Sequence, residues 1–196
     1  MTNTNYLGFF FAVISATLWG ISGTVAQFLF EQKGLNPEWL VCIRMMSAGA
    51  LLLLGMSWNK KSLIWTIWKE KSDRRSLWIF GVLGMLGVQY TYFAAIQHSN
   101  AATATVLQYL GPVFIAIYFV VINHKLPSLV EMIAIVLAMI GTYLMVTHGD
   151  WQNLSISLEA LFWGIMAAVT LAFYTIQPAK LLRKFNSGVV VGWGMF

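Results

Sequence analysis

The chain has 196 residues, of which 59% are hydrophobic and only 10% are charged. A soluble domain carries about 25% charged residues, so this composition excludes an ordinary soluble domain and indicates an integral membrane protein. The single cysteine, Cys42, excludes an internal disulfide, and the net charge of +5 has to be judged by where the basic residues lie along the chain.

Six stretches are long and apolar enough to cross a bilayer, which takes about 20 residues in a helix. They cover residues 6–29, 38–57, 77–97, 101–122, 129–147 and 158–178. A seventh stretch begins near Ser187 and is still apolar at Phe196. No cleavable signal peptide is expected, since no basic segment precedes the first apolar run. The sequence therefore predicts an all-α, polytopic membrane helix bundle.

Two of these spans begin with helix-capping residues. Before the second span, Asn36 is a predicted N-cap, Pro37 occupies the first helical position and Glu38 lies in the first turn. Ser128 and Glu131 have the spacing of a capping box at the start of the fifth span. Capping thus accounts for both acidic residues without a functional role.

The basic residues of the loops predict the orientation of the helices, because short cytoplasmic loops are enriched in Lys and Arg. Ten of them fall in the loops after spans two, four and six: Lys60, Lys61, Lys69, Lys71, Arg74, Arg75, Lys125, Lys180, Arg183 and Lys184. The loops of the opposite side contain only Lys33. We therefore predict a cytoplasmic N-terminus in the cell (inner or plasma) membrane. A nucleic-acid or partner site in loop 60–75 is the less favoured interpretation, since the asymmetry recurs in three loops, and no nucleic-acid partner is expected.

Small residues form stripes on three spans, and such stripes let helices approach closely in lipid. The stripes are Ala12, Ser15, Ala16, Trp19, Gly20 and Gly23 in the first span, Gly81, Gly84 and Gly87 in the third, and Gly164, Ala167, Ala168 and Ala172 in the sixth. Tight helix packing is the favoured interpretation of each stripe.

Polar side chains lie beside these stripes. A glutamine facing lipid would be expensive, so each one has to face another helix or a wet cavity. For any single glutamine an interhelical hydrogen bond is favoured, but several of them together with tyrosines and an arginine favour a polar central cavity. The predicted lining of this substrate-binding cavity is Trp19, Arg44, Gln89, Tyr92, Gln108 and Tyr174.

Arg44 is the one charged residue well inside a predicted span. It lies about 9 Å along the helix from Glu38, at 1.5 Å per residue, and a guanidinium is always charged. Trp19 is expected at a comparable level, where its indole is a candidate cation–π partner. Two roles remain open at this point: an anchor between helices, or a partner for a substrate carboxylate or phosphate.

Pro112 follows Gly111 near the middle of the fourth span. A proline removes one backbone hydrogen bond and kinks a helix. In a membrane this is tolerated where the freed carbonyl finds a partner or lines a cavity. A purely structural kink and a gating kink are equally compatible with the sequence.

The acidic residues and histidines lie at span ends or in loops. No spacing resembles a metal site, a Ser/His/Asp set or a phosphate-binding glycine loop. We therefore expect no enzymatic activity, no metal site and no cofactor. The same distribution predicts that these spans contain no proton-carrying side chain.

Four segments together resemble an EamA-type transporter of the drug/metabolite transporter superfamily. They are TLWGISGTVAQ (17–27), NPEWLVCIRMMSAG (36–49), TYFAAIQHSNAATATVLQYLGPVF (91–114) and LPSLVEMIAIVLAMIGTYLMV (126–146). The resemblance implies one complete five-helix module in residues 1–147 and the beginning of a second, inverted module in 148–196. Transporters built from such inverted repeats have ten helices, so the chain is expected to be truncated.

The resemblance also implies a function. It favours an inner-membrane secondary transporter, an exporter of small polar metabolites such as amino acids, which works by alternating access between two inverted repeats. The alternative is a membrane assembly or accessory subunit without transport; a lipid-modifying enzyme is disfavoured. The expected partners are a small-molecule substrate, the lipid bilayer, and either a second copy of the chain or the missing second-half helices.

Overall fold

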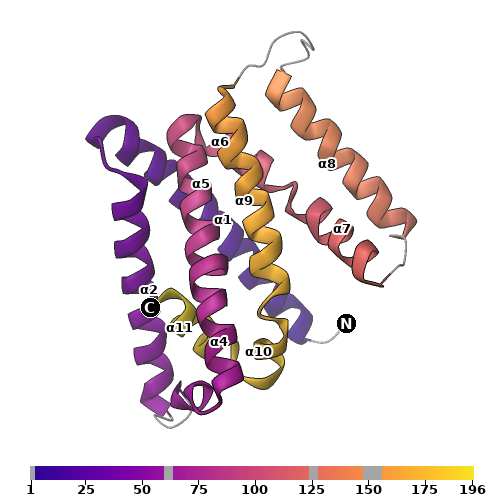
Figure 1. Ribbon diagram of the computed structural model, residues 1–196. Coiled ribbons are helices and arrows are strands. Elements are labelled where there is room, and N and C mark those ends of the chain that lie inside the picture. The colour runs from indigo at the N-terminus through magenta and orange to yellow at the C-terminus, as the bar shows by residue number, and fades with distance from the viewer. Residues whose placement is uncertain (1–2, 60–63, 124–127, 148–155) are drawn as a thin grey trace.

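A computed structural model (Figure 1) describes residues 3–59, 64–123, 128–147 and 156–196, and within these ranges the chain is helical without strands. The long helices are α1 (Asn3–Lys33), α2 (Pro37–Asn59), α5 (Gly87–His98), α7 (Gly111–Asn123), α8 (Leu129–Thr147) and α9 (Leu158–Ile176). The shorter ones are η1 (Thr66–Trp68), α4 (Lys71–Ile79), η2 (Phe80–Leu86), α6 (Ala101–Gln108), α10 (Ala179–Lys184) and α11 (Ser187–Met195). The predicted all-α helix bundle is confirmed.

Five stretches of the described residues are long and apolar enough to cross a membrane. They are Gly8–Lys33, Pro37–Trp58, Lys71–His98, Ala101–Ile122 and Leu158–Lys184. The third is longer than the predicted span 77–97, because the charged residues from Lys71 onward are also helical. Hydropathy alone leaves these charged residues out of the span. The fifth predicted span is present as α8, whose apolar part Leu129–Leu144 is shorter than the other five.

The bundle is built around α5 and α9, which lie side by side along their length in Figure 1. The hydroxyl groups of Thr91 and Thr170 form a hydrogen bond of 2.9 Å across this contact. The small-residue stripe of the sixth predicted span is buried, which confirms its packing role; Gly164 contacts Leu107 of α6 so closely that a Cβ atom there would lie 2.7 Å from the leucine Cβ.

The stripe on α1 behaves differently. Only Gly23, at its C-terminal end, is buried, whereas residues 12–20 are exposed and a Cβ on Gly20 would meet nothing within 4 Å. The prediction of tight packing is therefore wrong for this part of α1 within the described chain. Among the described helices, α5 and α6 make the most contacts with α1. Within residues 12–20, Trp19 reaches α5 through its edge-to-face contact with Tyr92.

The glycines of the third span pack closely on other helices, as expected: a Cβ atom on Gly84 would lie 3.7 Å from Tyr174 Cα, and one on Gly87 would lie 3.5 Å from Thr170 Cγ2. The backbone around them was not expected. Residues Phe80–Leu86 form a π-helical segment between α4 and α5, where the wider turn changes which side chains face the bundle. Gly81 lies in this segment against α11, with the Gly194 carbonyl 3.2 Å from the position of a Cβ atom. Hydrophobic periodicity cannot show such a segment, since it reports only which residues are apolar.

Both predicted helix starts are confirmed. Helix α2 begins at Pro37, directly after Asn36. The capping box at α8 is complete, because the Glu131 carboxylate accepts hydrogen bonds from the backbone N–H and the hydroxyl of Ser128 at 2.7 and 2.8 Å, and the Glu131 N–H donates back to Ser128 Oγ at 3.3 Å.

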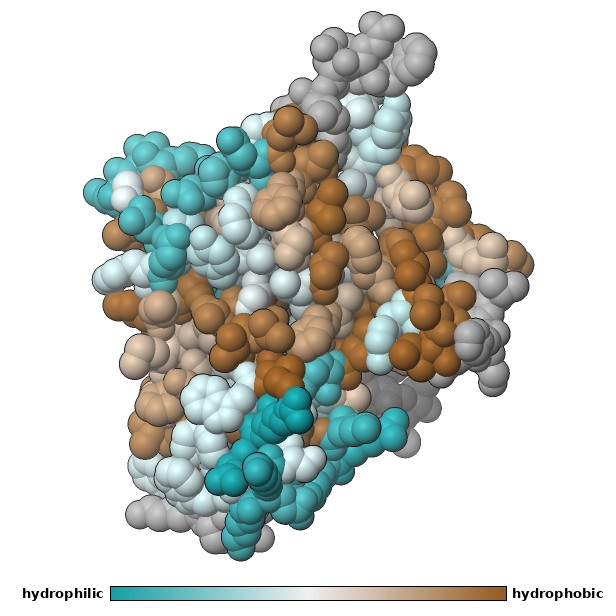
Figure 2. Space-filling view, in the orientation of Figure 1, coloured by the Kyte–Doolittle hydropathy of each residue, from teal (hydrophilic) through white to brown (hydrophobic). Residues whose placement is uncertain are grey.

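Polar side chains join α4 to the α9–α10 segment at one end of the bundle. Lys184 Nζ lies 2.8 Å from Glu70 and 2.7 Å from Asp73, and Gln177 donates to the carbonyl and hydroxyl of Ser76. Figure 2 shows hydrophilic residues over this lower end and over the end where α1 meets α2, with hydrophobic residues between them. This is the distribution expected of a membrane-spanning bundle.

Candidate functional site

A cavity of about 130 Å³ lies between helices of the predicted first module and the start of the second. Five elements line it: α1, α2, the η2–α5 span, α9 and α11. The lining residues are Trp19, Arg44, Met85, Val88, Gln89, Tyr92, Leu171, Tyr174, Val191 and Met195. Five of the six predicted cavity residues are thus brought together by the fold, while their role in substrate binding stays a prediction.

Arg44 is half-buried on α2 and lies between this cavity and a groove of about 310 Å³ at the contact of α1, α2 and α5, which Ser22 and Phe93 line as well. Its Nη1 donates a hydrogen bond of 2.6 Å to Ser22 Oγ on α1, and its Cζ lies 5.0 Å from the ring centroid of Phe93 on α5. The expected cation–π partner was Trp19, and that expectation is wrong. The indole of Trp19 instead packs edge-to-face on Tyr92 at 6.0 Å, which leaves the Phe93 ring as the aromatic surface next to the guanidinium.

Tyr92 forms the centre of one wall and is almost fully buried. Its hydroxyl lies 2.9 Å from Thr105 Oγ1 on α6, and a Cβ atom on Gly23 of α1 would come within 2.9 Å of that hydroxyl. The close approach of the α1 backbone therefore depends on glycine at position 23. Together these contacts fix the phenol ring between three helices.

Tyr174 forms the facing wall from α9. Its ring stacks on Phe80 of the π-helical segment, with centroids 5.6 Å apart and planes tilted by 24°. Gln89 lies beside it on α5 and adds the one amide of the lining. The cavity thus combines a cation, an amide and three aromatic rings with apolar walls.

Gln108 does not line this cavity. It is buried at the end of α6, where its Nε2 has no hydrogen-bond partner among the described residues. Pro112 lies on an exposed face of α7. The predicted kink is seen as an interruption of the helix at Tyr109 and Leu110, between α6 and α7. A gating role for this kink stays a prediction.

Sequence reasoning missed seven residues of this site. They are the apolar lining residues Met85, Val88, Leu171, Val191 and Met195 and the two neighbours of the guanidinium, Ser22 and Phe93. An apolar residue that lines a cavity looks the same in sequence as one that faces lipid. Ser22 carried a weak signal, since a hydroxyl within a membrane span needs a partner.

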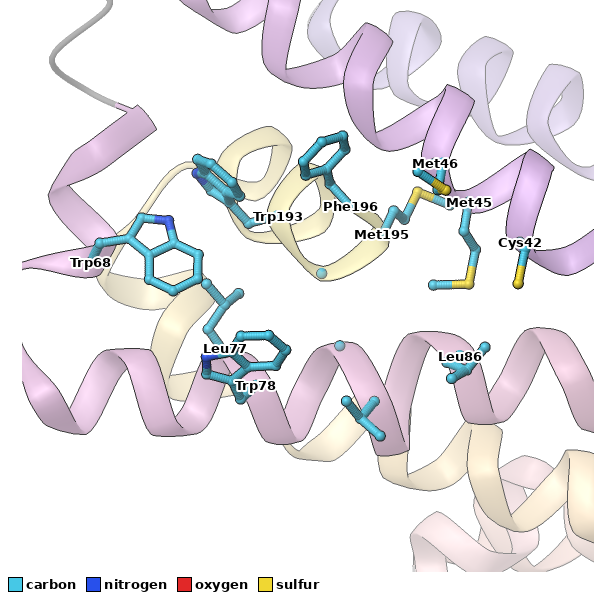
Figure 3. Close-up of a pocket in the computed structure, with 13 residues that line it drawn as sticks. Cys42, Met45, Met46, Trp68, Leu77, Trp78, Leu86, Trp193, Met195 and Phe196 are labelled. Carbon is cyan, nitrogen blue, oxygen red and sulfur yellow. The ribbon is translucent and has the colours of Figure 1, made fainter.

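A larger cavity, about 390 Å³, lies between α2, the α4–η2 span and α11 (Figure 3). Figure 3 shows indole rings, thioether groups and Phe196 around it, and its lining contains no charged side chain. Its size does not make it the better candidate, because polar recognition needs the charge and hydrogen-bonding groups that gather around Arg44.

The helices and the cavity define a multi-pass membrane protein with a partly polar interior site. The model of the EamA-like transporter family matches residues 6–147. The chain is 44% identical over 183 residues to the uncharacterized inner membrane transporter YicL of Salmonella typhimurium, covering 93% of this chain and 61% of that protein. The chain belongs to the EamA-like transporter family.

Two more distant proteins are similar as well, the second of them in fold alone. An uncharacterized transporter of Archaeoglobus fulgidus is 26% identical over 163 residues, covering 79% of this chain and 52% of its own length. A protein of known crystal structure shares the fold with a TM-score of 0.56 at 17% identity, over 92% of this chain and 63% of that chain. The match to YicL covers 61% of that protein, so the chain spans about three fifths of its length.

Proposed function

We propose that the protein is an inner-membrane secondary transporter that exports small polar metabolites, such as amino acids, by alternating access. The observation that carries the proposal is that residues 1–147 and residues 148–196 line one cavity together. In transporters built from inverted repeats, the substrate site lies between the repeats. The accompanying partners are the lipid bilayer and either a second copy or further helices of the second repeat.

Alternating access requires contacts between the two repeats that break and re-form at each end of the bundle. Lys184, at the end of α10, pairs with Glu70 just before α4 and with Asp73 in the first turn of α4. The Lys184 and Glu70 side chains are exposed and Asp73 is partly buried, so these pairs at the surface contribute little to stability and are easily broken. They therefore suit a contact that opens during the transport cycle at the predicted cytoplasmic end.

We expect cross-linking of this contact to stop transport. The full-length protein would carry Glu70→Cys and Lys184→Cys. Cys42, the one cysteine of residues 1–196, would be replaced by serine so that it cannot react. Joining the two positions with a short bis-thiosulfonate reagent should abolish flux in proteoliposomes, and reduction should restore it. Each single-cysteine variant treated with the same reagent is the control. Full flux through a quantitatively cross-linked protein would contradict alternating access at this contact.

We also expect the N-terminus and the basic loops to be cytoplasmic. Lys69 and Lys33 are both exposed and lie at opposite ends of the bundle, so they form a matched pair for labelling. In the Cys42→Ser background, an impermeant thiol reagent added to intact cells should label Lys33→Cys and spare Lys69→Cys. Labelling of position 69 from outside would overturn the orientation. Loop 148–157, also predicted to be external, lies largely outside the described residues.

An accessory subunit without transport is the alternative. Its interfaces would be exposed faces such as residues 12–18 of α1. Uptake of a metabolite panel into proteoliposomes that contain the purified full-length protein separates the two functions. Saturable flux of any panel member excludes a purely accessory role, whereas no flux of any member contradicts the transporter.

A further inference from the structure

The guanidinium of Arg44 has no anionic partner among the residues that the structure describes. The ion pairs found within 4.0 Å in these residues are the two of Lys184, and neither involves Arg44. Its contacts are a neutral hydroxyl, Ser22 Oγ, and a neutral ring, Phe93. A half-buried charge surrounded by apolar helices is expensive without a counter-charge, so the site is positively charged and incompletely paired.

The nearest acid along α2 is Glu38, and it is engaged elsewhere. It precedes Arg44 by six residues and accepts a hydrogen bond of 3.2 Å from the Tyr90 hydroxyl. No aspartate or glutamate is among the residues that line the cavity. The net charge of the lining is therefore +1, contributed by Arg44 alone.

The guanidinium has N–H donors left for a further hydrogen-bonding partner. It has five N–H donors in a planar fork, and the hydrogen bond to Ser22 uses one of them. The Phe93 ring at 5.0 Å and the hydroxyl at 2.6 Å hold the group between α1, α2 and α5. A carboxylate matches the planar fork with two parallel hydrogen bonds, and a group that is already positioned loses little freedom on binding.

The other lining residues indicate which chemical groups the rest of the ligand would carry. Trp19, Tyr92 and Tyr174 contribute aromatic surface, Gln89 one amide, and the remaining lining is aliphatic or thioether. A zwitterionic amino acid would bring an ammonium group, for which the described part of the lining offers no carboxylate. A phosphate dianion would bring a second negative charge, for which the same residues offer no second cation.

We propose that the substrate is a small organic monocarboxylate with an apolar or aromatic body, and that Arg44 binds its carboxylate. This inference rests on the proposed transport function and narrows it, because it disfavours zwitterions that the broader class of polar metabolites includes. Arg44 is then a specificity-determining residue, whose charge the substrate neutralises inside the membrane.

Three probes with the same phenyl body test the charge requirement on the unaltered full-length protein in lipid nanodiscs. They are 3-phenylpropionate, its neutral amide 3-phenylpropionamide, and phenylalanine, which adds an ammonium group. Binding would be measured by calorimetry and by ligand-induced thermal stabilisation. We expect the carboxylate to bind about 10- to 100-fold more tightly than the amide, the range for a hydrogen-bonded charge, and more tightly than phenylalanine. Equal binding of the three, tighter binding of the amide or of phenylalanine, or no binding of any of them overturns the proposal.

Variants locate the effect at Arg44. Arg44→Gln should remove the preference for the carboxylate over the amide, and Arg44→Lys should keep part of it, since lysine keeps the charge but loses the planar fork. Arg75→Ala, on the exposed face of α4 away from the cavity, is the matched control and should keep the full preference. If Arg44→Gln keeps the preference, Arg44 is not the anion-binding group; should the variants not fold, the three-probe comparison on the unaltered protein still decides.

Flux separates this proposal from the transport function. In proteoliposomes, saturable flux of phenylalanine or the amide at the rate of the carboxylate would contradict anion recognition and leave transport standing. Selective binding of the carboxylate without flux of any probe or panel metabolite would contradict transport and leave anion recognition standing.

Discussion

Replacing Gly164 with alanine should destabilise the protein, although alanine is the better helix former. The gain in helix propensity is about 1 kcal/mol. Against it stands overpacking, which costs about 1–3 kcal/mol and occasionally more. The added Cβ would lie 2.7 Å from the Cβ and 3.0 Å from the Cγ of Leu107, and closer still to its Cδ1. Since two of these contacts are shorter than 3.0 Å, the cost of overpacking should lie at the upper end of its range, and we expect a net loss of about 2 kcal/mol.

The cost of overpacking should exceed the gain in helix propensity, because Leu107 cannot move away. It is fully buried on α6, and its Cβ is attached directly to a helix backbone that packs on α9. A flexible side-chain end would yield at little cost, whereas a shift of Leu107 Cβ requires the two helices to separate. The contact that makes Gly164 necessary is thus between the α9 backbone and the Leu107 side chain, including its Cβ atom, which cannot rotate away.

The thermal unfolding midpoint of the purified full-length protein measures this effect. Gly20→Ala on α1 is the matched control, since a Cβ there meets nothing within 4 Å and should leave the midpoint unchanged or raise it slightly. In a Leu107→Ala background, which removes the Cγ and Cδ1 contacts and keeps the Cβ contact, Gly164→Ala should cost less stability than it does in the natural sequence. An unchanged midpoint for Gly164→Ala, or the same cost in both backgrounds, would refute the close contact with Leu107.

The sequence allowed the membrane spans, their caps and the polar and aromatic half of the cavity lining to be predicted, because each has a local cause. Length and apolar composition define a span, and side-chain chemistry defines the caps at Pro37 and Ser128. The polar residues Arg44 and Gln89 were identifiable since burying them in lipid is costly. These arguments require no knowledge of which helices are neighbours.

The remaining features depend on neighbours. The choice of Phe93 rather than Trp19 as the partner of Arg44 follows from how α1, α2 and α5 are rotated about their axes. Gln108 satisfies the same sequence criterion as Gln89, yet it packs within the helices instead of lining the cavity. The π-helical turn at Phe80–Leu86 changes which residues face α9 and α11, and hydropathy contains no signal for it.

Phe93→Ala should cause the second large loss of stability and also release the guanidinium of Arg44. The Phe93 ring is fully buried, lies edge-on to Phe30 with centroids 6.1 Å apart, and faces Arg44. Such a truncation costs about 3–5 kcal/mol in a soluble core. Lipid is as apolar as the helix interior, so the transfer term is small here. We expect about 2–3 kcal/mol from the lost packing and the lost cation–π contact together.

A double-mutant cycle separates these two contributions. Phe93→Leu keeps most of the volume but removes the aromatic face, and Arg44→Met keeps an unbranched side chain but removes the charge. The coupling between the two substitutions should be about 0.5–2 kcal/mol, the range of a cation–π contact, as measured by thermal midpoints in nanodiscs. Met85→Leu, at a cavity position away from the Arg44–Phe93 contact, should show no coupling to Arg44→Met. A coupling near zero between positions 44 and 93 would mean that the ring only fills space, and that Ser22 alone positions the guanidinium.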